Sequence, residues 1–131
     1  MAESMSKLDR LRAVAQAFDT HDLDGIMEHF TDDCVFESPR GPEAHGRRFV
    51  GADEVREGFA LRFAGMPDVR YTQDEHFVCG DQGVSEWLLS GTTTDGKRIE
   101  VRGCDIWKFR GEKIVLKNSF WKIRTDGSLR P

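Results

Sequence analysis

A single acid interrupts an otherwise apolar stripe in the stretch RIEVRGCDIWKF, residues 98–109. With the two-residue period of a β-strand, alternate residues share one face. That face would carry Ile99, Val101, Gly103, Asp105, Trp107 and Phe109. A carboxyl on an apolar face costs free energy unless it is hydrogen-bonded, paired or protonated. Asp105 is therefore a candidate proton donor or base. The alternative is a structural acid tied to Tyr71, a histidine or a lysine.

The last predicted strand offers Asp105 a partner. Lys117, Ser119 and Trp121 share one of its faces, and an inward Lys117 could neutralise Asp105 or hold an anionic substrate group. The alternative places Lys117 in solvent and Trp121 in the core, because buried lysines are rare without a partner. Periodicity does not decide, since the other face is also apolar. It carries Ile114, Leu116 and Phe120.

Two further sites could hold titratable groups. His76, in DEHFVCG, is a candidate proton shuttle near neutral pH, or a surface residue of its strand. In VSEWLLSG, Glu86 and Trp87 are adjacent, so only one of them can face inward. We expect Trp87 to do so, because charged side chains are seldom fully buried.

The stretch from Ser38 to Gly51, SPRGPEAHGRRFVG, is predicted to be a loop because of its prolines and glycines. Four of its residues are basic or carry an imidazole: Arg40, His45, Arg47 and Arg48. They could recognise a carboxylate or a phosphate, although solvated loop charge is the favoured interpretation. His21 and His29 are expected to be structural.

Composition excludes several functional classes. The chain has 131 residues, which predicts one domain over 1–131, with frayed ends at 1–5 and 126–131. A net charge of −4 argues against a nucleic-acid or a membrane partner. The N-terminus lacks an apolar signal segment, and the three cysteines have no metal spacing, which together predict a cytoplasmic protein with reduced thiols. No metal site and no cofactor are expected, because HxH, HxxxH, GxGxxG and P-loop motifs are absent from the sequence.

Helical periodicity precedes a change to a two-residue period. Helices are predicted at 6–20, 21–30 and 52–63, and strands at 34–38, 69–79, 83–94, 98–110 and 113–124. The last four strands are joined by short turns, which predicts an antiparallel meander. The fold class is therefore α+β, with three helices packed on a strongly curved, mainly antiparallel sheet that encloses a cone. We expect a homodimer through the outer, charged face, where Arg98, Glu100 and Arg102 alternate in sign.

Two segments, DLDGIMEHFTDDCVFESPRGPEAHG and GKRIEVRGCDIWKFRGEKIVLKNSFW, resemble the nuclear-transport-factor-2-like superfamily. The similarity is to its ketosteroid-isomerase and SnoaL-like polyketide-cyclase branches, and it spans roughly Lys7 to Arg124. The resemblance implies a cone-shaped fold with an interior pocket, and it places the face of Lys117 in that pocket. It leaves function open, because this fold hosts isomerases, cyclases, dehydratases, hydrolases and non-catalytic binders.

The ketosteroid-isomerase pattern carries over at one of three catalytic positions. Asp105 matches the acid that donates a hydrogen bond to an oxyanion. Ser38 stands where that family has its basic aspartate, and Val14 stands where it has a tyrosine. These departures argue against steroid isomerisation. The acid of the cyclase branch is likewise missing from VLKNSFWK.

Two hypotheses follow for a small-molecule ligand. The first is a cofactor-free isomerase, dehydratase or cyclase that acts on a small, largely apolar substrate through Asp105, Lys117 and His76. The second is a non-catalytic protein that binds a hydrophobic ligand or serves as a dimeric scaffold. In either case the expected pocket lining is Val14, Phe18, Ser38, Trp87, Val101, Trp107, Ser119 and Trp121.

Overall fold

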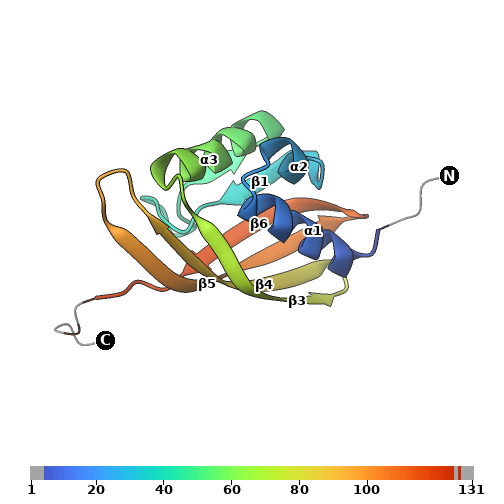
Figure 1. Cartoon of the computed structure of the whole chain (residues 1–131). Coiled ribbons are helices and arrows are strands. Elements are labelled where there is room, and N and C mark those ends of the chain that lie inside the picture. The colour runs from blue at the N-terminus through green and yellow to red at the C-terminus, as the bar shows by residue number, and fades with distance from the viewer. Residues whose placement is uncertain (1–4, 126, 128–131) are drawn as a thin grey trace.

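The computed structural model describes residues 5–125 and 127, and it has three helices and a curved six-stranded sheet (Figure 1). The helices are α1 (Lys7–Asp19), α2 (Leu23–Met27) and α3 (Ala52–Gly65). The strands are β1 (Phe30–Glu37), β2 (Arg48–Val50), β3 (Arg70–Cys79), β4 (Gln82–Thr92), β5 (Arg98–Arg110) and β6 (Lys113–Trp121). The predicted α+β class is confirmed.

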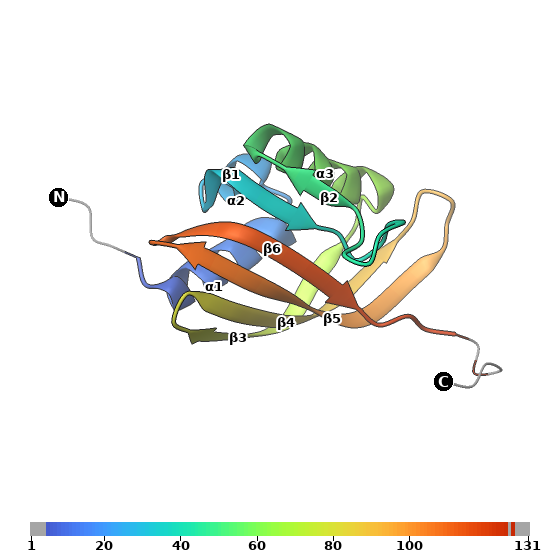
Figure 2. The same cartoon turned by 180° about the vertical axis from the view of Figure 1, so that it is seen from behind.

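The sheet has the strand order β2-β1-β6-β5-β4-β3. The predicted antiparallel meander of β3 to β6 is confirmed, and β1 joins it in parallel beside β6. Seen from behind, β1 and β2 lie next to β6 while β3 forms the far edge (Figure 2). The parallel pairing places the end of β1 beside the middle of β6, where Phe36 is opposite Lys117.

Local sequence explains where the helices begin. The Ser6 hydroxyl accepts a hydrogen bond from the backbone N–H of Asp9 at 3.0 Å and caps α1. Asp22 caps α2 in the same way through the backbone N–H of Gly25, also at 3.0 Å. Acidic residues in the first turn of α3 and Arg62 in its last turn suit the helix dipole.

Several predicted boundaries are wrong, among them the start of the first strand, which begins at Phe30 rather than at residue 34. The second helix ends at Met27 rather than at residue 30, because Phe30 already pairs with Ile114 and begins β1. The segment 38–51 is not all loop, since Arg48–Val50 forms β2 against β1. The last strand ends at Trp121 instead of residue 124. For the second helix and for the segment 38–51, tertiary pairing overrides the local signal.

Two irregularities change which side chains face inward. In β6 the pairing with β5 shifts between Lys108 and Phe109, which leaves Val115 as an extra residue. As a result both Ile114 and Lys117 are buried, although they lie three positions apart. In β3 a similar shift lies between Thr72 and Glu75, and Gln73 has a positive φ of 54°.

Buried side chains form two hydrophobic clusters between the helices and the sheet. The larger cluster includes Leu11, Val14 and Phe18 of α1, together with Phe59 and Trp107. The smaller lies toward the β4–β5 hairpin and is built from Met66, Val69, Trp87 and Leu89. No helix within the described residues is long and apolar enough to cross a membrane. The expected frayed ends fall mostly outside the residues that the structure describes.

Candidate functional site

A row of polar side chains crosses the inner face of the sheet. His76 of β3 pairs with Ser85 of β4, Ser85 pairs with Asp105 of β5, and Asp105 pairs with Ser119 of β6. All four are directly opposite one another, so their side chains project to the same side. Sequence analysis missed Ser85, although the short turn between β4 and β5 sets the register that places it opposite Asp105.

Asp105 is only 4% exposed, and it is not isolated among apolar groups. Its Oδ1 accepts hydrogen bonds from Lys117 Nζ at 2.7 Å and from Ser119 Oγ at 2.5 Å. Its Oδ2 accepts one from Trp87 Nε1 at 2.8 Å. The carboxylate therefore belongs to a buried ion pair with side-chain donors on both oxygens, which is the arrangement that a buried charge needs.

Lys117 contributes the positive charge of this pair from within a ring of aromatic side chains. Its Nζ lies 5.0 Å from the ring centroids of Phe18 and Phe36, and slightly farther from those of Phe59 and Trp107. Burial lowers the pKa of Lys117, and the charge of Asp105 opposes that shift. The bulge at Val115 turns this residue inward, which strand periodicity alone did not decide.

Trp87 reaches Asp105 because its neighbour on β5 has no side chain. Gly103 lies directly opposite Trp87, and a Cβ at that position would be 2.5 Å from the indole ring. Glu86, the adjacent residue, is exposed, so Trp87 rather than Glu86 faces inward. The glycine in the apolar stripe thus makes room for a hydrogen-bond donor to the acid two residues later.

A second chain of hydrogen bonds lies beside this network and reaches the surface, and among the described residues no hydrogen bond joins it to Asp105. His76 Nε2 lies 2.6 Å from the exposed Asp74 Oδ2, and His76 Nδ1 lies 2.7 Å from Ser85 Oγ. Trp107 Nε1 donates to the same Ser85 oxygen at 2.8 Å. The Ser85 oxygen accepts from Trp107, and its own hydroxyl proton can point at Nδ1 of His76 while Nε2–H donates to Asp74.

Comparison with known proteins agrees with this architecture. A family model described as the SnoaL-like domain matches residues 11–117. The chain belongs to the SnoaL-like domain family. No curated protein sequence matches it significantly.

Solved structures share the fold of this SnoaL-like domain at low sequence identity. A candidate polyketide cyclase from Pseudomonas putida is 14% identical with a TM-score of 0.79, over 92% of this chain and 94% of that one. TerC, co-crystallised with polyporic acid, is 18% identical with a TM-score of 0.75, over 88% and 91%. A hypothetical protein with a ketosteroid isomerase-like fold from Catenulispora acidiphila, in complex with trimethylamine, is 18% identical with a TM-score of 0.76, over 88% and 86%.

The interior of this SnoaL-like domain is nearly filled. Two cavities of about 20 Å³ each lie beside the network, and each is large enough for roughly one water molecule. Both are bordered by Phe18, Tyr71, Trp87 and Lys117. Burial raises the pKa of Tyr71. The open interior expected from a curled sheet is therefore closed by side chains.

The residues expected to line a pocket separate into three groups. Phe18, Trp87, Trp107 and Ser119 lie around the two cavities together with Asp105 and Lys117. Val14 belongs to the hydrophobic core and lines neither cavity, and Ser38 lies just after β1, outside both linings. Val101 borders a larger groove at the surface, and Trp121 borders both that groove and one of the two inner cavities.

The basic loop residues are also dispersed. Arg48 pairs with Glu37 at 2.7 Å, and Arg47 lies over the ring of Phe49. Arg40 borders the surface groove. His21 and His29 have structural contacts as expected: His21 bonds the Val69 carbonyl and His29 bonds Arg10. Within residues 5–125 and 127, no group of three or more His, Cys, Asp or Glu could hold a metal ion.

Proposed function

We propose that this protein is a cofactor-free acid–base enzyme that acts on a small, largely apolar molecule. The observation that carries the proposal is the carboxylate of Asp105, 4% exposed and 2.7 Å from the lysine ammonium on the inner face of the sheet. Charged pairs with perturbed titration cluster at functional sites. The candidate polyketide cyclase among the structural relatives supports this class of reaction.

Each group would have a distinct role. Asp105 takes a proton from a carbon acid, such as the position next to a carbonyl, and returns it at another atom or to a leaving hydroxyl. Lys117, with Ser119 beside it, holds the negative charge that develops on the carbonyl oxygen. His76 exchanges protons with solvent through Asp74. Isomerisation, dehydration and cyclisation all begin with such a proton transfer.

Substrate binding would open the interior. In this proposal the helices and the curved sheet enclose a cone whose space is taken by Phe18, Tyr71 and Trp87 when no substrate is bound. These rings border both inner cavities, so their rotation would join the cavities beside Lys117. The small molecules held by TerC and by the Catenulispora protein support a ligand site in this fold.

A second candidate is a non-catalytic binding protein. The observation in its favour is that both oxygens of Asp105 already accept hydrogen bonds, from Trp87, Lys117 and Ser119. A fully bonded carboxylate beside cavities that hold one water can be purely structural.

We also propose that the outer face of the sheet forms a homodimer. Arg98, Glu100 and Arg102 are exposed on it, as are the apolar Ile106 and Phe120, at 38% and 48%. Exposed aromatic groups beside alternating charges suit an isologous interface. Light scattering after gel filtration should give twice the chain mass, and Phe120→Lys should give the chain mass.

Hydrogen–deuterium exchange tests the enzymatic proposal without knowledge of the substrate. A small apolar ketone, 2-tetralone, is incubated in D₂O with the protein, and loss of its α-proton signal is followed by NMR. We expect the wild type to accelerate exchange and Asp105→Asn to reduce that rate by about 10²–10⁴-fold. Asp33→Asn removes an exposed acid and is the matched control.

The two candidate functions give different results. Equal exchange with the wild type and Asp105→Asn, when circular dichroism shows both to be folded, would reject a role for Asp105 in proton transfer. A thermal shift with the ketone in both proteins, without accelerated exchange, would support the non-catalytic candidate.

A further inference from the structure

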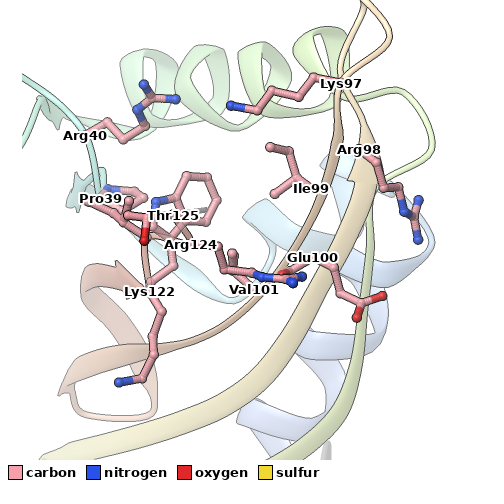
Figure 3. A pocket seen from close by; sticks show the side chains of 12 residues that line it. Pro39, Arg40, Lys97, Arg98, Ile99, Glu100, Val101, Lys122, Arg124 and Thr125 are labelled. Atoms are coloured by element: carbon pink, nitrogen blue, oxygen red, sulfur yellow. The ribbon is translucent and has the colours of Figure 1, made fainter. Parts of the chain in front are cut away.

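A groove of about 530 Å³ lies on the surface at one end of the sheet. Its walls are the chain just after β1, the start of β5, and the chain that follows β6 (Figure 3). It is separate from the two inner cavities, which are more than twenty times smaller in volume. The acid–base proposal assigns nothing to it.

The groove collects positive charge in a protein whose net charge is −4. In the part of the chain that the structure describes, its lining has one acid, Glu100, and five cations: Arg40, Lys97, Arg98, Lys122 and Arg124. Among the described residues, the charged ends of Arg40 and Lys97 have no hydrogen-bond or ion-pair partner, whereas Arg124 donates to the Glu100 carbonyl. Figure 3 shows Arg40 and Lys97 extending toward one another along one side of the pocket.

The other walls are apolar. Ile99 and Val101 face the groove from β5, and Trp121 faces it from the end of β6. All three are half-buried, so an occupant can remove further apolar area from water. Two unpartnered cations beside an aromatic and aliphatic surface fit a molecule that has one anionic end and a flat apolar body.

The groove shares a wall with the inner site. Pro39 and Trp121 border both the groove and the inner cavity that contains Lys117 and Ser119. The guanidinium of Arg62 lies over the Trp121 ring, 4.5 Å from its centroid, on the inner side. A shift of Trp121 would therefore connect the groove to the buried ion pair.

We infer that the groove binds an amphipathic organic carboxylate, and that this is the substrate class of the protein. The carboxylate lies between Arg40 and Lys97, and the apolar part of the molecule lies against Ile99 and Trp121. It is then next to the wall that separates the groove from the inner cavity. The identification of the bound acid as a substrate rests on the proposed function, whereas its binding in the groove does not.

Titration with three probes tests the inference. The probes are 2-naphthoate, the neutral 2-naphthylmethanol, and acetate, which has the carboxylate without the aromatic ring system. Binding is followed in ¹⁵N-labelled protein through the indole N–H signals of the three tryptophans. We expect 2-naphthoate to shift the Trp121 signal first and to bind more tightly than either other probe, with an affinity that falls as salt is added.

Charge variants locate the site. Arg40→Ala/Lys97→Ala should weaken 2-naphthoate binding by about fivefold or more, since each exposed charge pair contributes modestly. The matched control, Arg12→Ala/Lys108→Ala, removes one arginine and one lysine from exposed positions outside the groove and should bind as the wild type does. Equal affinity of the acid and the alcohol, equal effects of the two double variants, or no binding would overturn the inference.

Asp105→Asn separates this inference from the proposed function. Unchanged naphthoate binding in that variant, together with no accelerated ketone exchange in the wild type, leaves the groove as a binding site and rejects the acid–base enzyme. Accelerated exchange without naphthoate binding keeps the enzyme and rejects the carboxylate class.

Discussion

The inner site and the surface groove use the same kinds of side chain under opposite conditions. Lys117 is 7% exposed and bonded to a carboxylate, whereas Arg40 and Lys97 are exposed and have no such partner among the described residues. A buried ammonium loses its hydration, so it must be paired, while an exposed one keeps its water at little cost. The difference indicates that the inner charges are fixed by the fold and the outer ones remain available to a ligand.

Removal of the buried cation should have the largest effect on stability. Lys117→Met keeps most of the side-chain length but leaves Asp105 with Ser119 and Trp87 as its remaining donors among the described residues. We expect the free energy of unfolding in urea to fall by about 3–5 kcal/mol, as for other broken buried pairs. Lys97→Met, in the groove, should change it by less than about 0.5 kcal/mol. Similar losses of unfolding free energy in both variants would contradict the difference between the buried and the exposed lysine.

Removal of both buried charges should restore part of that loss. Asp105→Asn/Lys117→Met keeps an acceptor for Trp87 and removes both charges of the pair. We expect the double variant to be more stable than Lys117→Met by about 2 kcal/mol, which a double-mutant cycle measures as coupling. Strictly additive losses would mean that the two side chains do not act as a pair.

Gly103 tests whether packing holds the donor in place. A Cβ in Gly103→Ala meets the Trp87 ring, so the indole must move away from Asp105. We expect a loss of about 1–2 kcal/mol and a change in the chemical shift of the Trp87 indole proton. Gly65→Ala is the control, because nothing lies within 4 Å of the added carbon. An unchanged indole signal would show that Trp87 reaches the acid without the space at Gly103.

Sequence alone predicted the elements that hold the inner site. Strict alternation over residues 98–109 placed Asp105 on the buried face, and short glycine-containing turns fixed the order of β3 to β6. Strand alternation and short turns are set by neighbouring residues, so they can be predicted without knowledge of the tertiary contacts. The family resemblance is confirmed as well.

Other features depended on contacts that no local pattern records. The extra residue at Val115 changes which residues of β6 face inward. For this reason a two-residue period did not decide whether Lys117 is buried or exposed. The strand β2 forms only because β1 pairs with it, in a stretch rich in proline and glycine. The closed interior follows from the packing of Phe18, Tyr71 and Trp87, and the groove joins three segments far apart in the chain.

The smallest expected effect is a dependence of stability on alkaline pH. Burial lowers the pKa of Lys117 below its ordinary value of 10.5, so between the two values the unfolded chain binds more protons than the folded one. The free energy of unfolding contributed by Lys117 must therefore rise with pH over that interval.

Tyr71 acts in the opposite direction above about pH 10, because its raised pKa lets the folded chain keep a proton that the unfolded chain loses. The difference between the wild type and Lys117→Met cancels the tyrosine contribution, and urea unfolding at several alkaline pH values measures it. A difference that stays constant with pH would mean that Lys117 titrates alike inside the fold and in the unfolded chain, and the contrast between buried and exposed cations would then lie in packing rather than in charge.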